Sequence, residues 1–259
     1  MLDGIVTGYE GKFDFPARGG PPDLFYLLAS VPRSGSTYLS HVLWATGCLG
    51  APLEYLNFDP AGPYSFASKS PALQRDLWRS VLRRRTSPNG VFGLKAFPVQ
   101  LEALHQENPA LVTGVLEMLL NGGRSPRIVY LSRRDRVAHA VSYARAALSG
   151  VWRKEQEGPA PRVDYSEEAL REAERLIDGQ SSAWEAMFQD LGVQPLRLWH
   201  EDVVAEPRRA AARTAEYLGV ALSPAAAVQV PVIAKQDQSD AKRWISRYAP
   251  GPETRERDA

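Results

Sequence analysis

Residues 25–37 of the chain read FYLLASVPRSGST, and this stretch indicates the fold. Its first part, residues 25–31, is an apolar run without polar alternation, which is typical of a strand buried on both faces in a parallel sheet covered by helices. After a short loop, apolar residues from Leu39 to Leu43 follow helical spacing, and Gly47 is a suitable stop for that helix. A buried strand, a loop and a helix in this order form one unit of an α/β fold.

The same strand-to-helix order recurs along the chain. Residues 127–131 predict a strand that leads to Asp135, which is a good N-cap for a second helix. Further strands are predicted at residues 91–97 and 196–199, and further helices at 167–191, interrupted near Gly179, and at 207–218, with Gly219 as the stop. This alternation predicts an α/β fold in a single domain, a doubly wound parallel sheet flanked by helices, whose ligands bind beyond the carboxyl ends of the strands.

The two ends of the chain differ in composition from the segment between them. Residues 1–22 end in Gly-Gly-Pro-Pro and predict an N-terminal arm, residues 23–249 predict the folded domain, and residues 250–259 predict a polar, flexible tail. The segment 153–164 has Gly158 and two prolines among charged residues, so we expect a surface loop that could cover the site as a lid.

The overall charge disfavours several classes of partner. Of 259 residues, 31 are basic and 30 acidic, so the formal net charge is +1 and no whole-chain field favours nucleic acid or an anionic membrane. The single cysteine, Cys48, cannot form an internal disulfide, which suits the cytoplasm. We find neither a signal peptide nor a run of about 18 apolar residues, and therefore expect no membrane insertion.

Residues 32–37, PRSGST, have the chemistry that phosphate binding needs. The turn contains a glycine and three hydroxyl residues: Ser34, Gly35, Ser36 and Thr37. A tight turn of this kind can point N–H groups and hydroxyls inward, and the next helix adds positive potential at its N-terminus. Arg33 adds a guanidinium able to hold a phosphate with two parallel hydrogen bonds. The alternative is a Ser-rich turn that only caps the helix.

The strand followed by PRSGST resembles the 5′-phosphosulfate loop of sulfotransferases, which share a P-loop-like fold with nucleotide kinases. The resemblance implies that residues 23–249 are a sulfotransferase domain with a P-loop-like sheet. It also implies 3′-phosphoadenosine 5′-phosphosulfate (PAPS) as the co-substrate and no metal. The implied reaction moves a sulfuryl group by in-line displacement to a hydroxyl of a small molecule, a sugar or another alcohol.

A second family signature is an arginine after a strand and a serine about eight or nine residues later, which together grip the 3′-phosphate of the nucleotide. In YLSRRDRVAHAVSYARAA the matching serine is Ser142. Arg133 and Arg134 both match the arginine, at spacings of nine and eight residues, so the choice between them stays open.

Three segments resemble bacterial trehalose sulfotransferases in particular: ATGCLGAPLEYLN, AVSYARAALSGVWR and KQDQSDAKRWISRY. In that family a glutamate after the first helix is the proposed general base, and Glu54 matches it. Lys95 resembles the lysine that stabilises charge on the leaving phosphate, and with Arg33 it completes the expected catalytic set. Animal cytosolic members use a histidine as base, but Ala96 follows Lys95 here. The resemblance further implies that Lys235 covers the nucleotide and that the protein is a homodimer.

Other functions stay open at this point. An ATP-dependent small-molecule kinase would need a Walker-type lysine in a GxxxxGK[ST] loop and a magnesium carboxylate, whereas this loop has Arg33. A noncatalytic nucleotide-binding protein would keep the loop and lose the chemistry. A nucleic-acid enzyme is disfavoured, because no basic stripe with interleaved aromatic residues accompanies the near-zero net charge.

Overall fold

The structure is a computed structural model, and it describes residues 6–16, 19–60, 62–120, 125–152, 163–222, 229–232 and 239–248. The chain forms two compact units. The first unit consists of Met1–Arg134 and Gln180–Val232, and the second consists of Asp135–Gly179 and Ile233–Ala259. The predicted tail 250–259 lies outside the described residues, as does most of the predicted loop 153–164.

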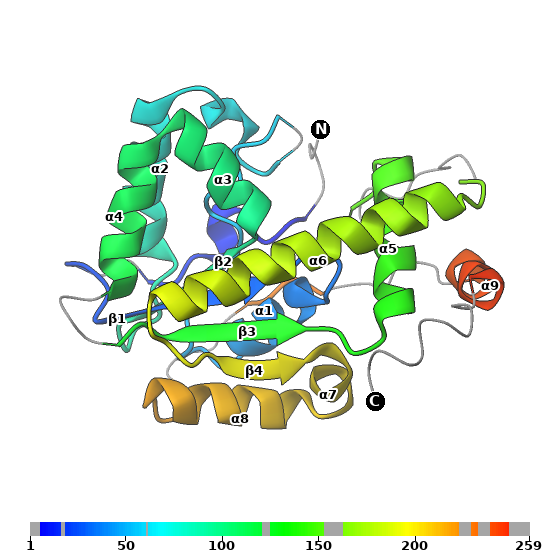
Figure 1. The fold of residues 1–259 in the computed structure, drawn as a ribbon. Coiled ribbons are helices and arrows are strands. Elements are labelled where there is room, and N and C mark those ends of the chain that lie inside the picture. Colours follow the sequence, from blue (N-terminus) through cyan, green and yellow to red (C-terminus); the bar gives the residue numbers. More distant parts are fainter. Residues whose placement is uncertain are drawn as a thin grey trace. The chain divides into compact units, whose positions relative to one another are not determined.

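A parallel β-sheet forms the centre of the first unit (Figure 1). Within the described residues it has four strands, β1 Leu24–Ser30, β2 Val91–Ala96, β3 Ile128–Ser132 and β4 Leu196–Trp199, in the order β2-β1-β3-β4. Strand β1 pairs in parallel with β2 and with β3, and β3 pairs in parallel with β4. The predicted strands are therefore confirmed, and the fold is the expected α/β fold.

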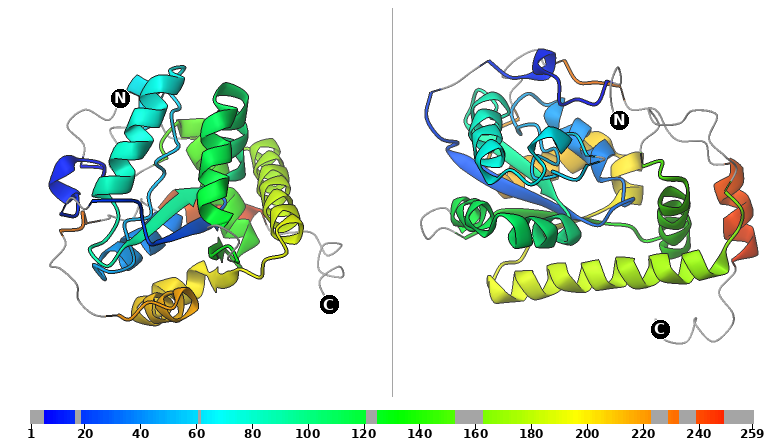
Figure 2. Two further views of the ribbon diagram at one scale, coloured as in Figure 1. Left: turned by 90° about the vertical axis from the view of Figure 1, so that its left-hand side faces the viewer. Right: turned by 90° about the horizontal axis from the view of Figure 1, so that it is seen from above.

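Helices cover both faces of this sheet (Figure 2). Those of the first unit, with two short 3-10 turns, are η1 Gly11–Phe13, α1 Ser36–Trp44, η2 Ser65–Ala67, α2 Pro71–Arg84, α3 Pro98–Glu107, α4 Pro109–Leu120, α7 His200–Ala205 and α8 Pro207–Leu218. On one face, Tyr26 of β1 shares an apolar cluster with Leu39 of α1 and Ala211 of α8. Because side chains alternate along a strand, Phe25 points to the other face, where its ring contacts Trp78 of α2.

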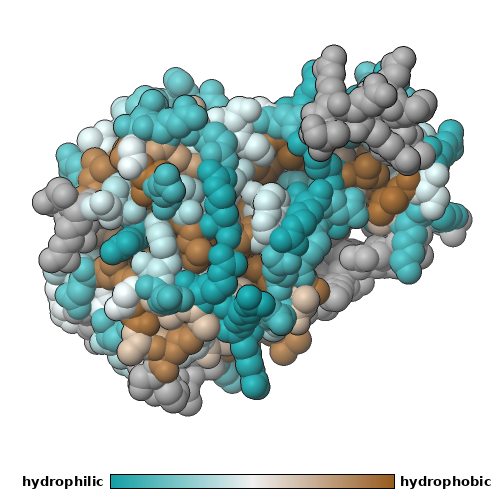
Figure 3. Space-filling model, turned by 60° about the horizontal axis from the view of Figure 1, so that its bottom comes forward, coloured by the Kyte–Doolittle hydropathy of each residue, from teal (hydrophilic) through white to brown (hydrophobic). Residues whose placement is uncertain are grey.

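Helix α8 shows how the sequence pattern places these elements. Its alanines Ala210 and Ala211 are buried, whereas Arg209 and Arg213 are exposed. Figure 3 brings this side of the first unit forward, and hydrophilic side chains lie across it. Helix α8 ends as predicted, because Gly219 follows it with a φ of 70°. Among the helices that the structure describes, none combines the length and the apolarity needed to cross a membrane.

The described part of the second unit is mainly helical. It contains α5 Arg136–Ser149, α9 Ser239–Arg247 and the first part of α6 Glu167–Asp190. Asp135 caps α5 as predicted, because its side chain accepts a hydrogen bond of 2.8 Å from the N–H of Ala138. The three helices share a small apolar core that includes Val141, Leu170 and Trp244.

Helix α6 runs without a break through Gly179, so the predicted interruption there is wrong. A glycine inside a helix costs about 1 kcal/mol relative to alanine. Apolar residues at helical spacing on both sides, including Leu170 and Trp184, are fully buried and stabilise the helix despite that cost. Gly179 instead marks the point along α6 where the two compact units divide.

Candidate active site

The loop between β1 and α1 has two residues in the left-handed region of backbone conformation. Arg33 has a φ of 69° and Gly35 a φ of 87°. Gly35 is also the N-cap of α1, and a Cβ atom added to it would lie 2.1 Å from Nδ1 of His200. Both its φ and this close approach therefore require glycine. For a residue with a side chain, such as Arg33, the conformation costs roughly 1–3 kcal/mol, and such residues cluster at functional sites.

The hydroxyl residues of this loop are largely buried at the start of α1. Ser34 is fully buried, and its Oγ has no hydrogen-bond partner within the part of the chain that the structure describes. Ser36 is 4% exposed. A buried hydroxyl without a partner costs about 1–3 kcal/mol, and the first N–H groups of a helix have no intrahelical acceptor. These donors fit a phosphate or sulfate group, which binds readily at a helix N-terminus.

Lys95 connects this loop to Glu54. The lysine comes from β2, and its side chain is completely buried. Its Nζ atom donates to Thr37 Oγ1 at 3.0 Å and forms an ion pair with Glu54 Oε1 at 2.9 Å. An ammonium buried in this way needs such partners, because a lone charge in the interior is very costly. The structure therefore brings three of the predicted site residues into one chain of contacts.

The backbone explains why Glu54 lies beside Lys95. Leu53 forms a parallel β-bridge with Leu94, and the N–H of Lys95 donates to the carbonyl of Leu53 at 3.0 Å. The segment that carries Glu54 is thus attached along the outer side of β2. Glu54 itself is 9% exposed, which explains why its carboxylate needs hydrogen-bond partners.

Two amides that sequence reasoning missed hold the other oxygen of Glu54. Gln100 donates to Oε2 at 2.8 Å and Asn57 donates to the same atom at 3.2 Å. Gln100 lies in the first turn of α3, which begins at Pro98 immediately after the end of β2. A proline shortly after a predicted strand is a helix-start signal, and this signal could have placed Gln100 near the carboxyl end of β2.

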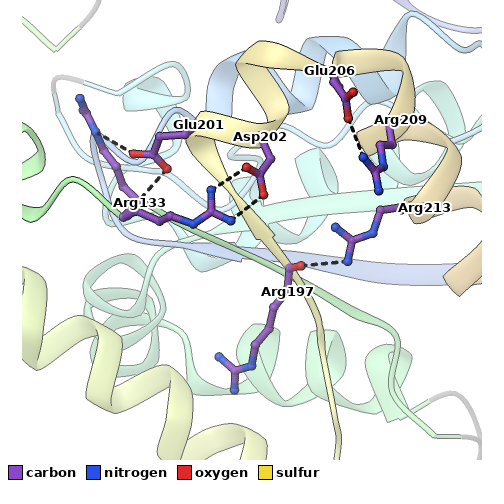
Figure 4. A network of polar contacts seen from close by, with 8 residues as sticks. Arg133, Arg197, Glu201, Asp202, Glu206, Arg209 and Arg213 are labelled. Atoms are coloured by element: carbon purple, nitrogen blue, oxygen red, sulfur yellow. Dashed lines mark hydrogen bonds and ion pairs between the residues drawn. The ribbon is translucent and has the colours of Figure 1, made fainter. Parts of the chain in front are cut away.

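The two arginines after β3 differ in their contacts (Figure 4). Arg134 donates to both oxygens of Asp202, at 2.6 and 2.8 Å, and these hydrogen bonds raise the pKa of Arg134 and lower the pKa of Asp202. Its guanidinium also lies 5.1 Å from the ring centroid of Trp199. Arg133 is more buried, with Nε 4.0 Å from Glu201 Oε1. Figure 4 shows its guanidinium turned away from Asp202, on the opposite side of Glu201.

Two further predicted site residues, Ser142 and Lys235, belong to the second unit. Ser142 lies on α5 in the second unit, where it is half-buried. Lys235 lies outside the described residues. No group of three or more His, Cys, Asp or Glu side chains that could hold a metal ion is found among the residues whose positions are described. The roles of Ser142 and Lys235 stay predictions.

Two known proteins have sequences similar to this chain over most of its length. Trehalose 2-sulfotransferase of Mycobacterium tuberculosis is 26% identical in an alignment 263 residues long, and the match covers 86% of this chain and 93% of that protein. Trehalose 2-sulfotransferase of Mycolicibacterium smegmatis is 27% identical over 255 residues, with the same two coverages of 86% and 93%.

Two solved sulfotransferase domains are also similar. The domain from the curacin biosynthetic pathway has a TM-score of 0.49 and 18% identity, and the match covers 78% of this chain and 76% of that one. The domain from the Synechococcus PCC 7002 olefin synthase has a TM-score of 0.46 and 15% identity, with coverages of 82% and 78%.

A sequence model of the Stf0 sulphotransferases matches residues 25–250. This match contains the described parallel sheet except Leu24, the loop with Gly35, and both members of the buried pair of Glu54 and Lys95. Because it extends over nearly all of the folded chain, this protein belongs to the Stf0 sulphotransferase family and is an enzyme that transfers a sulfuryl group.

Proposed function

We propose that the sulfuryl donor is PAPS and that the acceptor is a hydroxyl of a small molecule. The observation that carries the proposal is the chain of contacts from Thr37 through Lys95 to Glu54, with distances of 3.0 and 2.9 Å. It supports a site in which an anion-binding loop, a buried cation and a carboxylate lie within one side-chain contact of each other. In-line sulfuryl transfer needs these three groups, for the donor, the leaving phosphate and the acceptor proton respectively.

The donor would be held at both of its phosphate-bearing ends. The loop N–H groups, the buried hydroxyl of Ser34 and the guanidinium of Arg33 bind the 5′-phosphosulfate. For the 3′-phosphate we assign Arg133 rather than Arg134, because both Nη atoms of Arg134 already bond Asp202. Ser142 remains the partner that the sequence predicts for this phosphate.

The chemical step is a single displacement. Glu54 takes the proton of the acceptor hydroxyl while the hydroxyl oxygen attacks sulfur in line with the leaving phosphate. The new O–S bond forms as the S–O bond to the phosphate breaks, and its electron pair remains on the phosphate oxygen, near Lys95 and Arg33. The products are a sulfate ester and adenosine 3′,5′-bisphosphate. A positioned general base typically contributes about 10²–10⁴-fold to the rate.

The contacts of Glu54 favour the charged form that a base requires. The ammonium of Lys95 lies on Oε1, and the amides of Gln100 and Asn57 donate to Oε2. An opposite charge and hydrogen bonds to the carboxylate both stabilise the ionised state. The ionised carboxylate is the form that can take the proton of the acceptor hydroxyl.

The acceptor belongs to the class that the relatives act on. Both curated relatives are named trehalose 2-sulfotransferases. We propose a sugar or another small alcohol as the acceptor of this chain. A panel of sugars and simple alcohols, incubated with PAPS and followed by mass spectrometry, identifies the compound that gains a sulfuryl group.

Calorimetric titration with adenosine 3′,5′-bisphosphate, and separately with Mg-ATP, tests the donor site. We expect metal-independent binding of the bisphosphate that weakens at least tenfold in Arg33→Ala, since charge-assisted contacts of this kind contribute roughly 1.5–3 kcal/mol. Arg75→Ala, which removes an exposed arginine of α2, is the matched control and leaves the affinity unchanged. Binding of Mg-ATP alone would reject PAPS as the donor.

Substitution of Glu54 tests the proposed base. Glu54→Gln keeps the size of the side chain and loses the proton acceptor, so we expect transfer to fall about 100-fold or more while bisphosphate binding stays within twofold. Unchanged transfer in Glu54→Gln would show that another group is the base.

Arg133→Ala and Arg134→Ala, compared in the titration with adenosine 3′,5′-bisphosphate, distinguish the two candidates for binding the 3′-phosphate.

We further propose that the enzyme acts in the cytoplasm as a homodimer and that Lys235 covers the bound nucleotide, as the family resemblance implies. Light scattering of the purified chain gives the oligomeric state. Lys235→Ala should weaken bisphosphate binding if the lysine covers the nucleotide.

A further inference from the structure

The N-terminal segment, residues 6–16, lies upstream of the family match, which begins at residue 25. It nevertheless contacts the proposed base directly. The hydroxyl of Tyr9 accepts a hydrogen bond of 3.1 Å from the backbone N–H of Glu54. The ring of Tyr9 packs edge-on against Tyr55, the next residue, with ring centroids 6.2 Å apart, and against Tyr64 at 5.3 Å. A residue outside the matched region thus contacts both the backbone of Glu54 and the ring that follows it.

Buried Arg85, at the end of α2, binds this segment to the rest of the first unit. The arginine is 2% exposed. Its guanidinium donates to the carbonyls of Gly8 at 2.8 Å and Glu10 at 3.1 Å, and its Nε lies 2.9 Å from Asp14 Oδ1. These contacts lie on both sides of Tyr9. A planar guanidinium with five N–H donors suits several carbonyl and carboxylate acceptors at fixed angles.

The turn around Tyr9 is also ordered from within. The carboxylate of Glu10 accepts from the N–H groups of Thr7 at 2.7 Å and Gly8 at 2.8 Å. Gly8 has a φ of 91°, and a Cβ atom there would lie 3.2 Å from Cγ of Pro231. Figure 2 shows residues 229–232 in orange beside the N-terminal segment in dark blue in both views. The segment is therefore held by its own turn, by Arg85 and by a distant part of the first unit.

We infer that the N-terminal segment is part of the active site and that Tyr9 is a positioning residue for Glu54. This rests on the proposed role of Glu54 as base. Without the Tyr9 hydroxyl, the N–H of Glu54 loses this hydrogen bond, and the segment from Glu54 to Asn57 can shift. A displacement of about 1 Å in a reacting group can lower a rate by roughly 100-fold. Because Tyr9 holds the backbone of Glu54, we expect it to act on the transfer step rather than on donor binding.

Tyr9→Phe tests the inference, because it removes the hydroxyl and keeps the ring. We expect kcat to fall about tenfold with an unchanged dissociation constant for adenosine 3′,5′-bisphosphate. We also expect faster amide hydrogen exchange in the peptide that carries Glu54, a readout that does not depend on activity. Tyr64→Phe is the matched control: it removes the hydroxyl of a buried ring packed on Tyr9 and leaves the bond to Glu54 in place, so kcat and exchange stay as in the wild type.

A double-mutant cycle separates positioning from general destabilisation. Arg85→Met releases the carbonyls of Gly8 and Glu10, and its loss of kcat should not add to that of Tyr9→Phe, because both act through one segment. If Arg85→Met fails to fold, Glu10→Ala loosens the same turn. Wild-type kcat and exchange in Tyr9→Phe, or full additivity in the cycle, overturns the inference. If instead Glu54 is not the base, Glu54→Gln keeps its activity. This result distinguishes a wrong base assignment from a wrong inference about Tyr9.

Discussion

At the residue scale, both oxygens of the Glu54 carboxylate have side-chain partners. The ammonium of Lys95 holds Oε1, whereas the amides of Gln100 and Asn57 hold Oε2. Lys95 and Gln100 lie on either side of the turn from β2 to α3, so a short stretch of chain supplies a donor to each oxygen. The orientation of the proposed base is therefore fixed by an unremarkable glutamine as much as by the lysine.

Exchange of that glutamine for glutamate should change the pH dependence of transfer. Gln100→Glu places a second carboxylate where an amide now lies 2.8 Å from Glu54 Oε2. Two carboxylates so close share a proton, so the acidic limb of the pH profile of kcat should move to higher pH. Gln100→Ala, which only removes a donor, should shift it less.

The matched control for this experiment is Gln74, a buried amide of α2 that bonds Ala67 and Glu107 instead. Gln74→Glu should lower the unfolding temperature and leave the pH profile of kcat unchanged. A profile that moves equally in both variants would mean that Gln100 has no special relation to Glu54.

The residues of the site differ in how well the sequence reveals them. The loop around Gly35 has a compact pattern, and Lys95 is conspicuous because a lysine inside an apolar strand needs a polar partner. Tyr9, Asn57 and Gln100 have no such signature. An amide or a phenol in a turn is ordinary, and its contact with Glu54 depends on tertiary packing that no local pattern encodes.

At the element scale, the loop between β1 and α1 is tightly packed against the start of α7. Gly35 leaves no space for a side chain, because His200 occupies the position that a Cβ atom would take. The proposed donor-binding loop and the start of α7 are therefore in direct contact through Gly35 and His200. A change at either residue should alter the loop as a whole rather than one hydrogen bond.

Gly35→Ala should thus reduce both stability and donor binding. The φ of 87° disfavours alanine, and the clash with His200 at 2.1 Å forces the loop to move, so we expect at least tenfold weaker binding of adenosine 3′,5′-bisphosphate. Gly114→Ala is the opposite case. Within the described residues a Cβ there meets no atom closer than 4 Å, and in the middle of α4 it should stabilise the protein by about 0.5–1 kcal/mol.

Calorimetry and thermal unfolding of these two variants check the prediction. Normal donor binding in Gly35→Ala would mean that the loop can relax without loss of its anion site. Adding His200→Ala to Gly35→Ala removes the clash but not the unfavourable φ. The double variant should therefore recover only part of the affinity for adenosine 3′,5′-bisphosphate.

The strands and helices α1, α5 and α8 were predicted from the sequence, whereas α2, α3 and α4, which lie between β1 and β3 in the chain, were not. Helix α2 faces the core through Gln74, Trp78 and Val81, so a polar residue interrupts its apolar stripe. Helix α4 is apolar on most sides and has no clear period, while α3 buries only Leu104. In all three the proline at the start was the better signal.

At the scale of the whole molecule, acid should destabilise the protein. Burial raises the pKa of Glu10, but hydrogen bonds from Thr7 and Gly8 outweigh it, and the net pKa lies below the ordinary 4.5. Hydrogen bonds from Arg197 and Arg134 likewise lower the pKa values of Glu185 and Asp202. Asp14 is the opposite case, since burial raises its pKa despite Arg85 and Arg84.

The sign of the pH dependence follows from these directions. Carboxyl groups with a lowered folded pKa bind fewer protons in the native than in the unfolded state, so their stabilisation is present above pH 4.5 and is lost as pH falls through the folded values. Asp14 offsets part of this loss. We expect a lower unfolding temperature at about pH 3.5 than at about pH 7. Circular dichroism measures both temperatures. Glu185→Gln should flatten this dependence, and an unfolding temperature equal at both pH values would contradict it.

The buried pair of Glu54 and Lys95 also constrains how this protein can change over evolution. Loss of either partner leaves the other charge buried without its counterpart, which typically destabilises a protein by about 3–5 kcal/mol. The two positions are therefore expected to be inherited together, and a relative that has replaced one should also have replaced the other. A redesign that seeks a new base in this scaffold has to rebuild both positions in the same step.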